Sequence, residues 1–194
     1  VDNGRTLPAE EIETEHVMVH PNLNVGGAGG FTRGMLEAMD HKEKPTHVLL
    51  MDDDVMILPE SLIRTYNLLK IIRPEYEHHF ISGAMLFYEE MNFLYEDVGF
   101  MDHEGTYGPL KDRVDTRKIE DVLRCEEMIH EPKNAYAGWW YCCIPMEFVR
   151  KDNLPLPVFV RGDDVEYSLR NKAKFITLSG ICICLLYTSP SPRD

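Results

Sequence analysis

The chain has 194 residues, 44% hydrophobic and 27% charged, which is the composition of one globular domain with a sizeable core. Its 33 acidic and 20 basic residues give a formal net charge of −13, which argues against binding nucleic acid but allows a nucleotide whose phosphates are bridged by a metal. No apolar run approaches about 18 residues, so no membrane span is predicted. The five cysteines lack Cys-x-x-Cys spacing, which favours reduced thiols in the cytoplasm over a zinc site.

Both ends of the sequence look interrupted. Residues 1–4 read as the end of a strand and its turn, without the beginning of that strand. Residues 184–194 do not continue the pattern before them and resemble a translated sequencing adapter, with a genuine Ser/Pro-rich tail as the alternative. We therefore expect an incomplete catalytic domain over residues 1–183, followed by a non-native tail over residues 184–194.

The first predicted elements are a strand at residues 16–20, a glycine-dense loop at 21–30 and a helix at 31–40. Glycines between a strand and a helix allow backbone N–H groups to approach a phosphate or a sugar closely. Their spacing matches neither the dinucleotide fingerprint nor a P-loop. Ligand binding and tight packing of helix against sheet explain this loop equally well.

Three aspartates follow a short apolar run at residues 48–51, which is typical of a strand buried on both faces in a parallel sheet. In extended backbone Asp52 and Asp54 point the same way, and Asp53 points the other way. Two converging carboxylates repel each other unless a cation lies between them, and Mg²⁺ or Mn²⁺ shares oxygen ligands with phosphates. We predict a metal site at Asp52 and Asp54 that holds a diphosphate, with an acidic surface turn as the alternative.

The middle of the chain is predicted as a helix, two strands and an unassigned segment. The helix begins at Pro59 and has an apolar face made of Leu62, Ile63, Tyr66, Leu69 and Ile72. The strands are expected at residues 80–87 and 93–101. Residues 102–131 are charged and mixed, and no element is assigned to them.

Trp139 and Trp140 follow Gly138 directly, so an extended segment would place one indole on each face. One ring could belong to the core while the other lines a groove. Aromatic rings stack well on the apolar faces of sugars, and the indole N–H adds a polar group. Packing in the core explains either tryptophan taken singly.

A strand at residues 158–160 is predicted to lead into a helix that opens with Asp163 and Asp164. Acidic residues in a first helical turn are favoured by capping and by the helix dipole. Two adjacent acids leave one carboxylate to spare, and a spare carboxylate facing a polar pocket can act as a general base toward a hydroxyl.

Taken together, these stretches resemble the family 2 glycosyltransferases of the GT-A fold, most closely bacterial galactofuranosyltransferases and their relatives in surface-polysaccharide assembly. The motifs occur in the family order and span nearly all of residues 1–183. They are Asp2-Asn3-Gly4, the glycine-rich residues 22–31, Asp52-Asp53-Asp54, Gly138-Trp139-Trp140 and residues 161–167, which begin with Arg161-Gly162-Asp163-Asp164.

The resemblance implies a mixed, mostly parallel sheet flanked by helices and a reaction that inverts the anomeric centre. It implies Mn²⁺ or Mg²⁺ at Asp52 and Asp54, and Asp164 as catalytic base with Asp163 beside it. The acceptor site would contain Trp139, Trp140 and Asp163. A UDP-sugar donor would be bound by Asp2, Asn24, Gly26, Gly27, Asp52 and Asp53.

The resemblance suggests UDP-galactofuranose as donor, with UDP-galactose, UDP-glucose or a deoxyhexose donor left open. The acceptor would be a glycan or a lipid-linked glycan, and a lipid-linked acceptor would bring the protein to the inner face of the cell membrane. Two other functions stay open on the residues alone. One is a nucleotidyltransferase or phosphohydrolase that uses the aspartates with two metals, and the other is a carbohydrate-binding module built on Trp139 and Trp140.

The sequence departs from the family at its ends. The family places a metal-binding histidine after the last helix, where this chain has the adapter-like tail, and the first strand of the family is missing. We therefore expect this polypeptide by itself to fold poorly and to be inactive. The measurement is sugar transfer by the 194-residue chain, and robust turnover without added residues would contradict the expectation.

Overall fold

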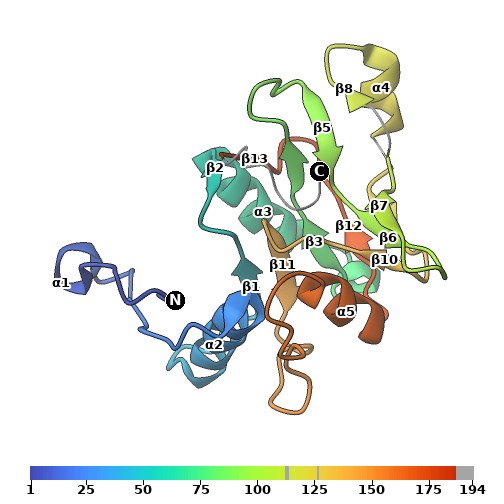
Figure 1. Cartoon of the computed structure of the whole chain (residues 1–194). Coiled ribbons are helices and arrows are strands. Elements are labelled where there is room, and N and C mark those ends of the chain that lie inside the picture. Colours follow the sequence, from blue (N-terminus) through green and yellow to red (C-terminus); the bar gives the residue numbers. More distant parts are fainter. Residues whose placement is uncertain (112–113, 126, 187–194) are drawn as a thin grey trace.

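The computed structural model describes residues 1–111, 114–125 and 127–186, which form a mixed α/β fold (Figure 1). The helices are α1 (Ala9–Ile12), α2 (Gly26–Asp40), α3 (Pro59–Ile71), α4 (Ile119–Arg124) and α5 (Asp163–Arg170), and a short 3-10 helix, η1 (Pro74–Tyr76), follows α3. Within these ranges, no helix is both long enough and apolar enough to cross a membrane.

The strands of the described residues form three sheets. The first sheet has the order β1 (His47–Leu50), β11 (Cys142–Pro145), β3 (Phe80–Ser82), β12 (Phe175–Ile176) and β9 (Ile129–His130). The second has the order β10 (Ala135–Tyr136), β6 (Gly99–Met101) and β7 (Tyr107–Pro109). The third has the order β2 (Val55–Ile57), β13 (Cys182–Leu185), β4 (Ala84–Leu86), β5 (Phe93–Glu96) and β8 (Val114–Asp115).

The expectation of a mostly parallel sheet is wrong. Among the described strands, only β12–β3 and β13–β4 pair in parallel, and the remaining pairs are antiparallel. Parallel neighbours need a long crossover, whereas antiparallel neighbours need only a short turn. Consecutive strands such as β4 and β5 pair directly with each other, and β12 reaches its parallel partner β3 only after α5. The GT-A arrangement itself stays a prediction.

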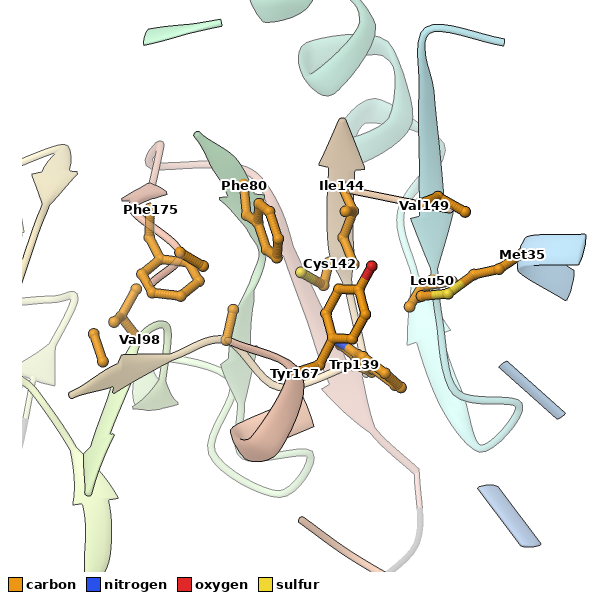
Figure 2. Packing of buried hydrophobic residues seen from close by; sticks show 13 residues of the cluster. Met35, Leu50, Phe80, Val98, Trp139, Cys142, Ile144, Val149, Tyr167 and Phe175 are labelled. Atoms are coloured by element: carbon orange, nitrogen blue, oxygen red, sulfur yellow. The ribbon is translucent and has the colours of Figure 1, made fainter. Parts of the chain in front are cut away.

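The first sheet separates two hydrophobic cores. Phe80 packs in a cluster with Met35 of α2 and Tyr167 of α5, and Figure 2 shows this cluster close up. The next residue along β3, Ile81, packs in the other cluster, against which Leu69 of α3 lies. Because successive residues of a strand point to opposite faces, α2 and α5 cover one face of the sheet and α3 covers the other. Helices therefore flank the sheet, as expected.

The strand that carries the aspartates is not in the middle of a sheet. In the described part of the chain, β1 pairs only with β11 and lies at the edge of its sheet. Leu50 is buried, whereas Val48 and Leu49 are half-buried and Met51 is exposed. The prediction of a strand buried on both faces is therefore wrong, because among the described residues one edge of β1 has no partner strand and part of its side-chain surface is accessible to solvent.

Two predicted strands are each divided between two sheets. Residues 80–87 contain β3 and β4, which are separated by Gly83. The Gly83 N–H donates to the Tyr141 carbonyl at 2.9 Å, and a Cβ at Gly83 would overlap the Tyr141 side chain. Residues 93–101 likewise contain β5 and β6, with Asp97 and Val98 between them. Where the chain bends from one sheet into another, its apolar residues continue without a break. The sequence therefore gives no sign of the change of sheet.

Helix α3 buries the predicted apolar face only in part, since Leu69 and Ile72 pack against the second core and the other three residues do not. Leu62, Ile63 and Tyr66 are exposed, while Ser61 and Thr65 are buried. The Thr65 hydroxyl lies 2.7 Å from the Tyr141 hydroxyl, and the Ser61 hydroxyl donates to the Cys182 carbonyl at 2.8 Å. Small polar side chains are buried here because the sheet supplies their hydrogen-bond partners.

Two further segments differ from the predictions. The strand predicted at residues 16–20 does not form, and this part of the chain contributes only the isolated bridges Thr14–Val17 and Asp2–Pro21. The unassigned stretch of residues 102–131 contributes β7, β8, α4 and β9, while residues 112–113 and 126 lie outside the described residues.

Strand β13 crosses the predicted boundary at residue 183. Cys184 pairs with Met56 of β2 and with Leu86 of β4, and the Leu186 N–H donates to the Asp54 carbonyl at 2.9 Å. Residues 187–194 lie outside the described residues. The division into a domain over residues 1–183 and a tail stays a prediction.

We expect the folded state to lose stability as the pH falls below about 6.5, the ordinary pKa of histidine. His130 is 3% exposed, with its Nε2 atom 3.0 Å from the Thr177 hydroxyl oxygen. Burial lowers the pKa of His130, and nearby Lys111 lowers it further. As the pH falls, His130 is therefore protonated in the unfolded chain before it is protonated in the folded protein. The free energy of unfolding then decreases by up to about 1.4 kcal/mol per pH unit.

Urea unfolding at pH 7.5, 6.5 and 5.5 measures this dependence. His130→Gln, which can keep a hydrogen bond to Thr177, is expected to flatten the decrease in stability. The control is His103→Gln at an exposed site, which should leave the decrease unchanged. Equal stability of the wild-type protein at all three pH values would contradict the assignment.

Candidate functional site

A cavity of about 720 Å³ lies where α2, the end of β1 and α5 meet. It collects most of the residues to which sequence analysis gave a role, namely Asn24, Gly26, Gly27, Asp52, Trp139, Trp140, Asp163 and Asp164. Asp2, Asp53 and Asp54 are not among its lining residues. The segments that were predicted to act together therefore share one cavity, although three of the predicted side chains lie outside it.

The second half of the predicted glycine-dense loop is helical, because α2 begins at Gly26 rather than at Phe31. Gly26 has φ +80°, and a Cβ on it would overlap the carbonyl oxygen of Phe159. The Gly27 N–H donates to that same oxygen at 3.3 Å, whereas a Cβ on Gly27 would meet only Asp163 Oδ2, at 3.6 Å. Gly26 thus serves close packing, and Gly27 faces the cavity.

Asn3 is a cavity residue to which sequence analysis gave no role of its own. Its side chain donates to the Gly26 carbonyl at 3.2 Å and accepts from Asn22 Nδ2 at 2.9 Å, so it fixes the first turn of α2. Asp2, predicted to bind the donor, is buried, and its carboxylate accepts from the Leu7 N–H at 2.9 Å. The resemblance gave a role in the Asp-Asn-Gly motif to Asp2 alone, whereas the side chain that lines the cavity is that of Asn3.

The three aspartates do not alternate along an extended strand. Strand β1 ends at Leu50, and the backbone bends at Asp53 and Asp54 before β2 begins. The Asp54 carbonyl accepts from Leu186 beside β13, and its side chain is exposed. Asp52 therefore reaches the cavity without Asp54. Across the described ranges, no group of three or more His, Cys, Asp or Glu side chains is placed to hold a metal ion. A metal site shared by Asp52 and Asp54 stays a prediction.

Trp139 and Trp140 form the side of the cavity that lies against the hydrophobic core. Trp139 is 3% exposed, with its ring centroid 5.0 Å from that of Phe31 and 5.7 Å from that of Tyr167. Trp140 is half-buried over Gly138, and its Nε1–H donates to the Gly83 carbonyl at 3.0 Å. They lie in a turn before β11 rather than in an extended segment. Trp139 accordingly belongs to the core and Trp140 is the more accessible ring.

A sharp turn before α5 sets the orientation of the acidic side chains at the start of this helix. The predicted strand at residues 158–160 is an irregular loop, which ends in the left-handed residues Arg161 (φ 60°) and Gly162 (φ 87°). Positive φ at an arginine is uncommon and needs support from its surroundings. Burial raises the pKa of the Asp163 carboxyl. The Asp164 carboxylate accepts from the Val165 N–H at 2.7 Å, so it shares in capping the helix while it lines the cavity.

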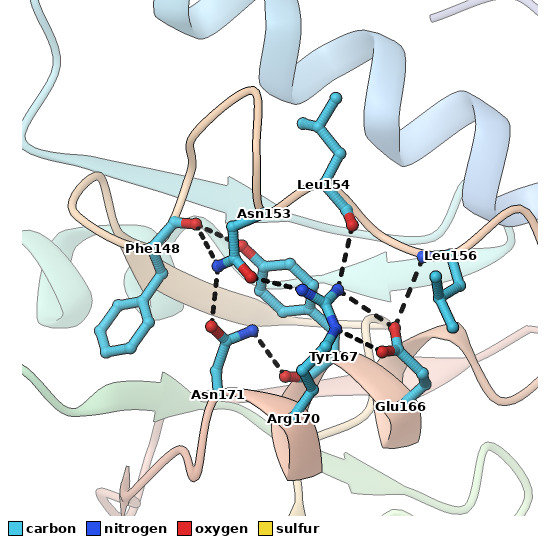
Figure 3. Close-up of polar contacts among 8 residues, drawn as sticks. All are labelled: Phe148, Asn153, Leu154, Leu156, Glu166, Tyr167, Arg170 and Asn171. Atoms are coloured by element: carbon cyan, nitrogen blue, oxygen red, sulfur yellow. Dashed lines mark hydrogen bonds and ion pairs between the residues drawn. The ribbon is translucent and has the colours of Figure 1, made fainter.

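A polar network fixes α5 to the preceding loop (Figure 3). Arg170 forms an ion pair with Glu166 and donates to the Leu154 carbonyl at 3.0 Å. Asn153 donates to the Phe148 carbonyl at 2.8 Å, and the Tyr167 hydroxyl donates to the same carbonyl at 2.8 Å. These contacts join Phe148, Asn153 and Leu154, in the first part of the 148–162 loop, to one helix, so the position of the acids does not depend on the loop alone.

Further acidic and aromatic residues of the cavity come from segments that the sequence left without a role. They include Tyr95, Glu96, Tyr107 and Tyr136. Four carboxylates (Asp52, Glu96, Asp163 and Asp164) and one guanidinium (Arg161) are among the described residues that line the cavity. An excess of carboxylates favours cations and hydroxyl donors over unaccompanied anions.

Glu96 and its neighbour Asp97 have different surroundings. Glu96 lines the large cavity, and Asp97 lines a second cavity of about 140 Å³. Asp97 is buried in an ion pair with Lys111, and its carboxylate also accepts from the Val98 N–H at 2.7 Å. The Ser82 hydroxyl donates to the Asp97 carbonyl. This buried pair anchors the backbone directly behind the wall of the large cavity.

Gly26→Ala is expected to destabilise the protein by at least about 2 kcal/mol. The alanine would have a positive φ angle, and its Cβ would also overlap the Phe159 backbone. The matched control is Gly27→Ala, whose methyl group would meet only ordinary contacts. Urea unfolding of both variants measures the difference. Equal stability of the two would contradict the assigned packing role of Gly26.

Comparison with known proteins gives two relatives, and no family model matches the chain. Galactofuranosyltransferase GlfT2 of Mycolicibacterium smegmatis is 28% identical over 172 residues, covering 80% of this chain and 25% of the relative. Galactofuranosyltransferase GlfT2 of Mycobacterium tuberculosis is 30% identical over 168 residues, covering 78% of this chain and 24% of the relative. The chain thus spans about a quarter of the length of these relatives. The matches support a relationship between this chain and glycosyltransferases.

Proposed function

We propose that the protein is a metal-dependent, inverting glycosyltransferase that moves a sugar from a UDP-sugar to a hydroxyl group of a glycan. The observation that carries the proposal is the single cavity that brings Asp52, Asp164 and the two tryptophans together. The relationship to galactofuranosyltransferases supports the same activity.

On the donor side, Asn24 and Gly27 would contact the UDP portion near the first turn of α2, where the helix dipole favours phosphate. The acidic lining would repel a bare diphosphate, and Asp52 would hold a divalent cation that offsets this repulsion. Mg²⁺ and Mn²⁺ suit such a site, because one or two carboxylates with phosphate oxygens and water complete their shell. We retain Asp54 as the second carboxylate and Asp53 as a donor contact. When bound, the ion supplies Lewis-acid neutralisation of the departing diphosphate.

On the acceptor side, Asp164 is proposed as the general base. Its carboxylate removes the proton from the acceptor hydroxyl while that oxygen bonds to the anomeric carbon and the bond to the diphosphate breaks. One displacement inverts the anomeric centre. Asp163 would bind the acceptor, and the accessible ring of Trp140 would hold the face of a sugar, with buried Trp139 forming the cavity wall beside it. Because burial raises the pKa of Asp163, it is a stronger base than an ordinary aspartate, so both acids need testing.

The relatives carry the name galactofuranosyltransferase, and we propose galactofuranose as the transferred sugar. The acceptor would be a glycan or a lipid-linked glycan of a bacterial surface polysaccharide, reached from the cytoplasmic face of the membrane. A nucleotidyltransferase or phosphohydrolase with two metals would need several acids around the ions. The described residues bring no three such ligands together, so no observation favours that alternative.

Asp52→Asn is expected to weaken Mn²⁺-dependent binding of UDP by at least about tenfold, since it removes a charged metal ligand. The chain contains two tryptophans, and both line the cavity, so intrinsic fluorescence reports its occupancy. Asp54→Asn gives the same loss if Asp54 is the second ligand. Asp164→Asn should keep UDP binding and abolish transfer in any form of the protein that turns over, with Asp163→Asn as its neighbouring comparison.

The control is Asp152→Asn, which changes an exposed acid outside the cavity and should bind UDP like the wild type. Tight UDP binding that persists in EDTA, or that Asp52→Asn leaves unchanged, would overturn the metal-dependent proposal.

A further inference from the structure

We propose that the second cavity, on the third sheet, is a binding site for a small, neutral molecule of hydrocarbon character, about the size of a benzene ring. This cavity has a volume of about 140 Å³ and shares none of its described lining residues with the large cavity. Its occupation therefore does not depend on the glycosyltransferase function proposed above.

A row of apolar side chains crosses one face of the third sheet and forms the floor of this cavity. Leu86 of β4 stands opposite Leu94 of β5, which stands opposite Val114 of β8. Residues directly opposite each other on paired strands lie on the same face of a sheet, and these three all line the cavity. Ala84 of β4 lines it too, whereas Met85 packs in the second hydrophobic core. The floor is thus apolar, and Ala84 is its smallest side chain.

The charge in the wall of this cavity is already paired. Asp97 is the only acidic or basic side chain among the described residues that line it. Asp97 is 4% exposed, forms an ion pair with Lys111 and accepts from the Val98 N–H at 2.7 Å. The thiols of Cys125 and Cys182 also line the cavity, and burial raises the pKa of both, so they are neutral at pH 7. A charged ligand would therefore have to displace Lys111 to find a partner here.

The hydroxyl groups of the wall are bonded within the protein. Those of Ser82 and Thr116 donate to backbone carbonyls, and the Thr177 hydroxyl oxygen lies 3.0 Å from His130 Nε2. Among the described residues, no buried side-chain nitrogen or oxygen of this cavity lacks a hydrogen-bond partner. A polar ligand would lose its hydrogen bonds to water and gain few in return, which is unfavourable.

The size of the cavity sets the size of the ligand. An apolar cavity of about 150 Å³ stays dry and binds benzene, and the volume here is about 140 Å³. Transfer of a hydrocarbon from water to such a surface is favourable. Thr116, Ser179 and Gly180 are exposed lining residues, so the cavity opens to solvent on their side and a ligand can enter there.

The first test compares toluene, benzylammonium and benzoate, which share one ring and differ in charge. Dissociation constants follow from the rise in melting temperature with probe concentration, since a ligand that binds the folded state stabilises it. Wild-type protein is expected to bind toluene at least about tenfold more tightly than either ion, with or without UDP and Mn²⁺. Failure to bind toluene, or binding of benzylammonium as tight as that of toluene, overturns the proposal. Displacement of toluene by UDP would place the ring in the large cavity and overturns it as well.

Ala84→Leu adds three carbon atoms to the floor of the cavity and is expected to weaken toluene binding at least about tenfold. The matched control is Ala9→Leu in α1, which adds the same atoms away from both cavities and should bind toluene like the wild type. Equal toluene binding by the two variants would contradict the assigned site.

A measurement on the wild type locates the ring without any variant. Nuclear Overhauser effects are expected between toluene and the methyl groups of Leu94 and Val114, which line the cavity. The control is Leu62, an exposed leucine of α3, whose methyl groups should show none. Contacts of toluene with Leu62 that are as strong as those with Leu94 and Val114 would mean non-specific adsorption and overturn the proposal.

Discussion

The cavity depends on one close approach between distant parts of the chain, the carbonyl of Phe159 against the α-carbon of Gly26. Nothing larger than hydrogen fits between them. The contact joins the first turn of α2 to the loop that leads into α5, and the Gly27 N–H adds a hydrogen bond to the same oxygen. It therefore sets the distance between the segment proposed to bind the donor and the acids proposed to act on the acceptor. The left-handed pair Arg161 and Gly162 then turns those acids inward.

The first sheet gives this contact a firm base. Its residues face alternately into two cores, so α2 and α5 are packed on the same face and cannot move apart without exposing that cluster. The network of Arg170, Glu166 and Asn153 binds the loop to α5 from the other side. Rigid support of this kind is what a site needs when catalysis depends on holding two substrates in line.

Sequence reasoning identified the helices better than the sheets. It placed the start of α3 at Pro59 and of α5 at Asp163, because proline and acidic residues in a first turn are local signals. It missed the division at Gly83, because a bend that moves the chain to another sheet depends on Tyr141, far away in sequence. It also misplaced β1, since an apolar run does not tell how many neighbours a strand has. The sheets are consequently mixed, against the expected parallel order.

The site shows the same division. Most residues to which a motif gave a role do line one cavity, namely Asn24, Gly26, Gly27, Asp52, Trp139, Trp140, Asp163 and Asp164. Asp54 does not, because the alternation rule holds only for extended backbone and the chain bends at Asp53. Asn3, Glu96 and Tyr136 could not be found from spacing, since their roles come from strand pairing and from contacts across the fold.

The adjacent residues Glu96 and Asp97 have separate roles in the structure. Asp97 and Lys111 secure the backbone in the interior, and removing either would leave an unpaired buried charge. Glu96 lies among the lining residues of the large cavity, and its carboxylate accepts a hydrogen bond from the Tyr136 hydroxyl. A substitution at Glu96 therefore changes the lining of the large cavity and leaves the ion pair between Asp97 and Lys111 in place.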